Sequence, residues 1–185
     1  LCYGNPEKPK QMWEFVEGTR GISDACNAIT LKDNPSYPTP IIAGNVSFYN
    51  ESKNGPIPPS PIVSCLGRLK DIDYVLPMHF QSSGSDILMV GERKDELGGS
   101  IYYQLLDELG ANVPKPDFVE VRSQIFAITD CAERGLVLSC HDISDGGIAT
   151  SIAEMTFRRS IGCLAKIPGD LQDHKILFSE TGGFV

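Results

Sequence analysis

Near the start of the chain, apolar side chains recur at the three- and four-residue spacing of one helical face. They follow Asn5-Pro6-Glu7-Lys8-Pro9, whose prolines are typical of a helix entry. The pattern predicts one long amphipathic helix, with Gly21 as the point at which it would break. The positions that define its apolar side are Met12, Phe15, Val16, Thr19, Ile22, Cys26 and Ile29.

Shorter apolar runs predict strands, because glycine, proline and other turn-forming residues bound them. After the proline-rich connection 34–40, residues 41–43 predict the first of these strands. Residues 47–50 and 61–66 flank Lys53-Asn54-Gly55-Pro56, an arrangement that predicts a long hairpin. Further strands are predicted over residues 86–91, 136–139, 161–167 and 176–179.

Three more helices are predicted beyond the middle of the chain. They cover residues 101–109, 118–131 and 147–158, and Gly110 and Gly135 close the first two. Because helices and strands of mixed length follow one another irregularly, we predict an α+β fold rather than a regular doubly wound sheet.

The composition turns charged over residues 68–73, which places a domain boundary near residue 70. With 185 residues and 20.2 kDa, the chain is long enough for one substantial domain or two small ones. It begins with Leu1, and residues 178–185 have the pattern of a strand and turn in progress. We therefore expect it to be a piece of a longer protein.

Charge and hydropathy exclude several classes of protein. Asp and Glu number 24 against 16 Lys and Arg, and the net charge of −8 opposes extended contact with nucleic acid or anionic lipid. The longest aliphatic run, residues 87–90, is far shorter than a membrane span. The six cysteines have no metal-ligand spacing, so we expect reduced, buried thiols and a cytoplasmic location.

The first candidate site is the segment Gly44-Asn45-Val46-Ser47, at the exit of the strand predicted over 41–43. Glycine allows a ligand to approach the backbone, and an amide and a hydroxyl can hold phosphate oxygens or magnesium. The alternative is a bulge at the end of the strand in which Asn45 and Ser47 only satisfy a turn. Four residues alone favour this alternative.

The second candidate is His141-Asp142-Ile143-Ser144-Asp145-Gly146-Gly147, between a predicted strand and a predicted helix. Two carboxylates precede flexible backbone and a positive helix N-terminus, a combination that suits magnesium and phosphate. In the alternative, Ser144 or Asp145 caps the helix and the glycines only shape the turn. His141 has no visible nucleophile partner.

Two further segments repeat this layout of charged loop and glycine pair. They are residues 91–100, which contain Asp95-Glu96-Leu97-Gly98-Gly99-Ser100, and residues 178–183, which contain Glu180. The acidic residues of the first could simply stabilise a helix N-terminus. The GxSxG motif of serine hydrolases does not occur. The P-loop and Rossmann glycine patterns are also absent, so any nucleotide would be bound by another kind of loop.

Taken in order, these motifs resemble the second half of the synthetase subunit of phosphoribosylformylglycinamidine synthase, in its short form (PurL). The likeness is carried by Gly4 to Pro9 with Trp13, by residues 44–51, by 95–100 and by 141–147. It implies a PurM-like two-domain unit. Residues 1–69 would be the end of its second ferredoxin-like domain, and residues 70–185 most of the domain that follows.

The resemblance also implies roles for particular residues. Gly44 would contact ATP, Asn45 would bind Mg²⁺, and Ser47 would contact formylglycinamide ribonucleotide. Asp142, Asp145, Gly146 and Gly147 would be nucleotide or structural contacts in the pseudo-equivalent of the active site. The catalytic histidines of the family match no residue here, so the isolated chain should be inactive.

The activity implied is an ATP-dependent carbon–nitrogen ligation in purine biosynthesis. Ammonia would come from a separate glutaminase subunit, with a small accessory subunit in the same synthase. Two departures from the family are the long segment 31–40 and Thr181-Gly182-Gly183, where relatives more often carry a polar residue and an arginine. The alternatives are a sister enzyme, such as a PurM-like kinase or aminoimidazole ribonucleotide synthetase, and a non-catalytic docking module.

Overall fold

The computed structural model describes residues 1–185, which form two compact units, Leu1–Arg68 and Leu69–Val185. Helices are combined with small antiparallel sheets, so the predicted α+β class is confirmed. No helix has the length and apolar character needed to cross a membrane.

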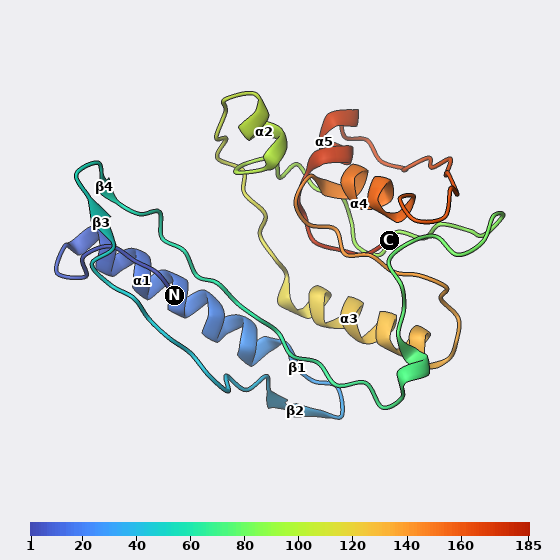
Figure 1. Ribbon diagram of the computed structural model, residues 1–185, viewed down its shortest axis with the longest axis horizontal. Coiled ribbons are helices and arrows are strands. Elements are labelled where there is room, and N and C mark those ends of the chain that lie inside the picture. Colours follow the sequence, from blue (N-terminus) through green and yellow to red (C-terminus); the bar gives the residue numbers. More distant parts are fainter. The chain divides into compact units, whose positions relative to one another are not determined.

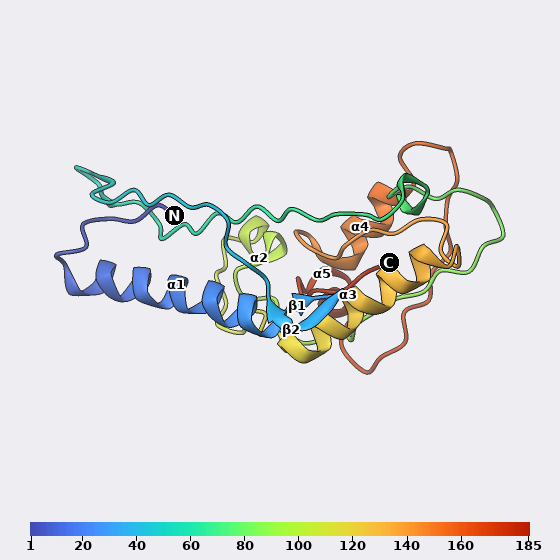
Figure 2. The ribbon, with the colours of Figure 1, turned by 90° about the horizontal axis from the view of Figure 1, so that it is seen from below.

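The first unit is built on α1 (Pro9–Ala28), which confirms the long helix predicted from the apolar spacing. Pro9 occupies the start of the helix, where a missing amide hydrogen costs nothing. The helix does not break at Gly21. Figures 1 and 2 show the extended segments that follow β2 and β4 running along the length of this helix.

Aromatic side chains form the core of the first unit. The ring of Phe15 on α1 makes edge-to-face contacts with Tyr3 at 5.4 Å and with Phe48 at 5.0 Å between centroids. Tyr3 is only 1% exposed, and burial, followed by the charge of Glu14, raises the pKa of its hydroxyl. A methyl group on Gly18 would collide with that hydroxyl, so glycine makes room for Tyr3 on the face of α1.

Two short hairpins complete the first unit, and neither is the long hairpin that was predicted. β1 (Thr30–Leu31) pairs with β2 (Asn34–Pro38), which lies within the segment interpreted as a proline-rich connection. β3 (Glu51–Ser52) pairs with β4 (Gly55–Pro56), so the turn at Lys53 and Asn54 closes a much tighter hairpin.

The second unit contains one 3₁₀ turn and four helices. They are η1 (Ile72–Tyr74), α2 (Ile101–Leu105), α3 (Phe118–Glu133), α4 (Gly147–Met155) and α5 (Asp173–Phe178). Ser100 and Asp117 cap α2 and α3 by accepting hydrogen bonds from backbone amides. The three predicted helices are therefore confirmed, although α2 and α4 end before Leu109 and Arg158.

The core of this unit lies under α4. Ile143, Ile148, Met155 and Val185 are buried together, and Phe80, Ile87, Met89, Ile152 and Ile167 pack against them. Figure 1 shows α5 beside α4, in agreement with the contacts between these two helices.

Most of the predicted strands are wrong. Residues 41–43, 136–139 and 161–167 are extended or irregular without ladder partners, and 176–178 belong to α5. Of the strand predicted over 86–91, only Val90 pairs, in an isolated bridge with Phe184. A run of apolar residues becomes a strand only when a neighbouring segment accepts its backbone hydrogen bonds, and apart from the partner of Val90 no such neighbour lies beside these segments. Several of their side chains are exposed, including Ile42 at 78% and Leu88 at 73%, whereas Ile87, Met89 and Ile167 are partly buried against the core.

The six cysteines are free thiols. Cys65 and Cys163 are exposed, so the expectation of burial is wrong for these two, and the other four cysteines are only partly buried. They lie in the segments whose predicted strands do not form. Burial, followed by the charge of Asp142, raises the pKa of the Cys140 thiol.

Candidate functional site

The GNVS segment (residues 44–47) is held in place by the first residues of the chain. The amino group of Leu1 donates to the Asn45 carbonyl at 2.9 Å, and the Ser47 amide donates to the Leu1 carbonyl at 2.9 Å. The Tyr3 amide then donates to the Ser47 carbonyl at 3.0 Å. On its other side Cys2 pairs with Ser60, so the opening segment lies between two extended parts of the chain.

Asn50 fixes the side chain of Ser47. The Ser47 hydroxyl donates to Asn50 Oδ1 at 3.1 Å, while Asn50 Nδ2 donates to the carbonyls of Tyr3 and Ser47, each at 2.9 Å. The hydroxyl proton is therefore used within the protein, and its oxygen lone pairs remain available as acceptors. To donate to a phosphate, Ser47 would have to release Asn50.

Gly44 and Asn45 are exposed, in contrast to Ser47. No atom of the chain lies within 4 Å of a side-chain carbon built on Gly44, so packing within this protein does not require glycine there. The backbone carbonyl of Asn45 is used by Leu1, which leaves its exposed side-chain amide as the oxygen that a ligand could reach.

The chain provides no complete magnesium site. Asn45 offers one neutral hard oxygen, which suits Mg²⁺ as a single ligand. No group of three His, Cys, Asp or Glu side chains converges to hold a metal ion anywhere in residues 1–185. Any bound Mg²⁺ would need most of its ligands from elsewhere.

A salt bridge joins the opening motif to the end of the GNVS region. Lys8 Nζ lies 2.9 Å from both carboxylate oxygens of Glu51, and the Asn5 amide donates to the same carboxylate at 3.0 Å. The hydrogen bond from Lys8, followed by that from Asn5, lowers the pKa of Glu51 below its ordinary value. These contacts tie the start of α1 to β3 and so position residues 44–51.

In the second unit, residues 183–185 lie between two other extended segments. Val90 and Phe184 exchange both backbone hydrogen bonds at 2.9 Å. On the other side His141 and Val185 exchange two, at 2.9 and 2.8 Å, and the Ile143 amide donates to Gly183 at 2.8 Å. This arrangement brings the 91–100, 141–147 and 178–183 motifs together.

Glu180 links two helix N-termini through one carboxylate oxygen. Its Oε1 accepts a hydrogen bond from the Ile101 amide at 2.8 Å, at the start of α2. It accepts a second from the Gly146 amide at 2.9 Å, at the start of α4. The alternative in which Ser144 or Asp145 caps α4 is wrong, because the N-cap is Gly146, no side chain caps the helix, and Glu180 accepts from the Gly146 amide instead.

Gly146 and Gly147 are required by the turn and by close packing. Both have positive φ, 77° and 67°, which disfavours a side chain. A side-chain carbon at Gly147 would lie 2.6 Å from the Leu177 carbonyl and 2.8 Å from the Ser179 carbonyl. The start of α4 can approach the end of α5 only because this residue is glycine.

Asp142 and Asp145 are both exposed. Asp142 Oδ1 lies 3.1 Å from His141 Nδ1, and Glu154 Oε2 lies 2.8 Å from His141 Nε2. His141 is thus held between two carboxylates and faces no nucleophile. The Asp145 side chain makes no hydrogen bond or ion pair, so its carboxylate is free to meet a ligand.

A buried polar network connects residues 93–96 to 179–182. Glu96, only 7% exposed, accepts hydrogen bonds from the Thr181 hydroxyl at 2.7 Å and from the Lys115 amide at 3.2 Å. Arg93 donates to the carbonyls of Ser179 and Gly182 at 3.3 and 3.0 Å. Burial lowers the pKa of the Arg93 guanidinium, and the charge of Glu96 opposes this.

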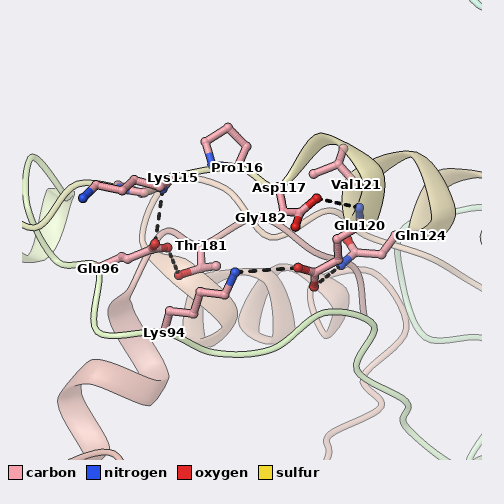
Figure 3. A pocket seen from close by; sticks show the side chains of 11 residues that line it. Lys94, Glu96, Lys115, Pro116, Asp117, Glu120, Val121, Gln124, Thr181 and Gly182 are labelled. Carbon is pink, nitrogen blue, oxygen red and sulfur yellow. Dashed lines mark hydrogen bonds and ion pairs between the residues drawn. The ribbon is translucent and has the colours of Figure 1, made fainter. Parts of the chain in front are cut away.

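This network forms one wall of a pocket of about 180 Å³. Figure 3 shows Glu96 and Thr181 on one side and the start of α3, with Asp117 and Glu120, on the other. Lys94 Nζ reaches across to within 3.6 Å of Glu120 Oε2. Lys94 pairs with Glu120 at this pocket, whereas Glu96 and Asp117 accept hydrogen bonds from a hydroxyl and from backbone amides.

Sequence reasoning missed several residues that position the candidate sites. Lys8, Asn50 and Glu51 lie inside the quoted motifs but were given no role. Glu96 was interpreted only as charge near a helix N-terminus, and Glu180 was named without its partners. The signal that could have identified these residues is that they are polar and lie within the motifs. Residues 44–47 belong to the first unit and residues 141–147 to the second.

Comparison with known proteins places the second unit in a family. Residues 82–185, more than half of the chain, match the family described as AIR synthase related protein, C-terminal domain. The chain belongs to this family. The PurM-like character expected from the ordered motifs is therefore confirmed.

Over its whole length, the chain is similar to curated proteins named phosphoribosylformylglycinamidine synthase subunit PurL. Identity is 45% to the protein of Methanothrix thermoacetophila, 38% to that of Methanothermobacter marburgensis and 34% to that of Lactobacillus acidophilus. These alignments cover 100%, 99% and 99% of this chain but only 24%, 25% and 23% of the relatives. The chain thus spans about a quarter of the length of these proteins, and the resemblance read from its motifs is confirmed.

Proposed function

We propose that this chain forms part of a synthase that uses ATP to join ammonia to formylglycinamide ribonucleotide. The products are formylglycinamidine ribonucleotide, ADP and phosphate, in purine biosynthesis. The observation that carries the proposal is the similarity along all 185 residues to PurL subunits at up to 45% identity. The whole enzyme's activity would reside in the longer protein, and the isolated chain would be inactive.

Within that enzyme the GNVS segment would face the ligands. Its exposed residues, Gly44 and Asn45, would contact ATP and Mg²⁺, and the partly buried Ser47 would contact the ribonucleotide. The hydrogen-bond network of Asn50 and the salt bridge between Lys8 and Glu51 support this role, because they hold the segment in one conformation. Bound Mg²⁺ would neutralise charge on the transferred phosphoryl group.

Asn45 would be one ligand among several, since the chain brings no group of three His, Cys, Asp or Glu side chains together to hold a metal ion. Phosphate oxygens of ATP and residues of the longer protein would complete the coordination. The residues of this chain would then act by holding the groups that contact the ligands in a fixed orientation. The Asn45 amide would present its oxygen, and Asn50 would hold the Ser47 hydroxyl at a fixed position.

The second unit would contribute a nucleotide contact of its own. We propose that Asp142 and Asp145 face a nucleotide, since both carboxylates are exposed. Gly146 and Gly147 would approach its phosphates only if Glu180 released the Gly146 amide. Ammonia would be supplied by a glutaminase subunit, with a small accessory subunit, and the synthase would act in the cytoplasm.

A chimera tests the proposal. The matching segment of the Methanothrix thermoacetophila PurL protein would be replaced by this chain, and ADP release would be measured with ATP, magnesium and ammonium. We expect release that requires both ammonium and formylglycinamide ribonucleotide, as in the unmodified relative. Release that ignores ammonium would instead indicate a kinase of the same superfamily. No release from a folded chimera would indicate a structural or docking role.

A further inference from the structure

A cluster of cationic side chains lies at the C-terminal end of α4, outside every motif described above. The Phe80 amide donates to the Met155 carbonyl at 2.9 Å, which brings residues 79–81 beside the end of this helix. Arg159 Nη1 donates to the Gln81 carbonyl at 3.5 Å. Residues 79–81 are thus adjacent to the segment that carries Arg158 and Arg159, just beyond the end of α4 at Met155, and the charges of both arginines act on His79.

No acidic side chain balances this cluster. Arg158 makes no hydrogen bond or ion pair, and Arg159 makes only the hydrogen bond to the Gln81 carbonyl. The His79 ring has no hydrogen-bond partner. In a chain with a net charge of −8, an unpaired gathering of like charges is unexpected, because acidic partners are abundant.

The position of the arginines after a helix explains part of the arrangement. Cations near a helix C-terminus interact favourably with its dipole, typically by less than about 1 kcal/mol at an exposed site. The dipole does not explain His79, whose protonation is opposed by its neighbours. Burial, followed by the charges of Arg158 and Arg159, lowers the pKa of its imidazole.

The chemistry of the cluster matches an oxyanion. Guanidinium groups present planar arrays of donors that fit phosphate oxygens, and an imidazolium adds a further charged donor. Phe157 immediately precedes the arginines and is 75% exposed, so an apolar surface adjoins the charges. A phosphate would supply the negative charge that the protein itself does not provide.

We propose that His79, Arg158 and Arg159 form a binding site for a phosphate group, either free or carried by a small organic molecule. This site is distinct from the GNVS segment and from the 141–147 loop, and it does not depend on the ligase activity proposed above. It lies within the second unit.

The test is a titration of the 185-residue chain with inorganic phosphate and, separately, with ribose 5-phosphate at physiological salt. The signals of His79 would be followed by NMR. Phosphate binding should shift these signals and raise the pKa of His79, because a nearby anion favours the imidazolium. Stronger binding of ribose 5-phosphate would assign the site to a phosphate ester, and equal binding would assign it to free phosphate.

The variant Arg158→Gln/Arg159→Gln removes both charges and keeps side chains of similar polarity. It should weaken phosphate binding by about tenfold or more, the scale of a lost charge-assisted hydrogen bond. The matched control is Arg134→Gln, an exposed arginine at the end of α3 that should leave binding unchanged. Circular dichroism of both variants would verify that they fold.

Two results would overturn the proposal. One is the absence of any shift at His79 up to about 10 mM phosphate, a concentration at which even weak sites are occupied. The other is equal loss of binding in the double variant and in Arg134→Gln, which would mean that phosphate responds only to the overall charge.

Discussion

The GNVS segment and the 178–183 segment show two ways in which one chain builds a motif. Residues 44–47 are positioned by backbone pairing with residues 1–3, and Gly44 and Asn45 remain exposed. Residues 178–183 are positioned by buried side chains, with Ser179 at 0% and Thr181 at 8% exposure. The first motif has groups left over for a ligand, whereas the second uses most of its groups to hold the protein together.

This difference separates recognition from stability. Substitutions in the 178–183 region should reduce the free energy of unfolding, since they leave buried polar groups without partners. Substitutions at the exposed GNVS residues should change ligand binding with little effect on folding. Substitutions in the two regions can therefore show whether stability and ligand binding depend on different residues.

Gly147→Ala should cause the largest loss of stability. The added methyl group would collide with the carbonyls of Leu177 and Ser179, and the backbone has φ of 67°. Strain and collision together should cost about 3 kcal/mol or more. Urea denaturation would measure the loss. Gly162→Ala is the matched control, because a methyl group there meets nothing within 4 Å, and equal stability of the two variants would refute the packing argument.

Glu180→Ala should have the next largest effect. It removes the acceptor shared by the Ile101 and Gly146 amides, at the starts of α2 and α4. Loss of the two caps should cost about 2 kcal/mol of unfolding free energy. Hydrogen exchange should become faster at both helix starts. Glu108→Ala, at an exposed glutamate, serves as the control, and protection that persists in Glu180→Ala would contradict the shared-cap role.

The sequence was sufficient to predict helices at α1, α2, α3 and α4, but it predicted neither α5 nor these contacts of Glu180. α1, α3 and α4 follow from apolar spacing and from residues adjacent in the chain, such as Pro9 and Asp117. Glu180 instead bonds to amides 79 and 34 positions away, and no local pattern specifies such partners. The predicted strands failed for a related reason, because a strand depends on a neighbour that its own residues do not encode.

For the candidate site, too, the sequence predicted the residues that lie next to one another in the chain but not the distant contacts that position them. Gly44, Asn45 and Ser47 were identified because the motif is contiguous, and its ordered companions gave the family. The contacts that orient it were not, since Lys8 and Glu51 are separated by 43 positions. Residue types in a motif indicate chemistry, while the geometry that makes the chemistry specific depends on tertiary pairing.

Ser47→Ala in the chimera should weaken binding of formylglycinamide ribonucleotide by about 1 to 2 kcal/mol, the scale of one hydrogen bond. The KM for this substrate should rise, while the KM for ATP should change little. Ser64→Ala is an exposed serine control in the same unit. An unchanged KM for the ribonucleotide in the Ser47 variant would exclude Ser47 from the substrate site.

Asn45→Leu in the same chimera should raise the magnesium concentration needed for half-maximal rate, because an oxygen ligand is replaced by an apolar group. Asn45→Asp keeps an oxygen at this position and should restore most of the affinity for magnesium. Magnesium titrations that superimpose for all three proteins would remove Asn45 from the metal site.

The smallest effect is expected at the salt bridge of Lys8 and Glu51, which is exposed to solvent. The hydrogen bond from Lys8 is the main cause of the lowered pKa of Glu51, so Lys8→Met should return this pKa toward its ordinary value. A lowered folded-state pKa means that the pair stabilises the fold above the unfolded-state pKa of glutamate, and that the stabilisation is lost as pH falls through the folded-state value.

Lys8→Met should therefore weaken the dependence of stability on pH in the acidic range, without altering the unfolding free energy elsewhere. NMR titration of the Glu51 carboxyl carbon would measure the pKa directly. Lys10→Met is the control, since Lys10 pairs with Glu14 at 3.8 Å and does not touch Glu51. If the pKa of Glu51 were the same in both variants, the Asn5 amide and not Lys8 would be the group that holds it low. The GNVS region would then be positioned by backbone contacts alone, which would make the contrast with the 178–183 segment sharper.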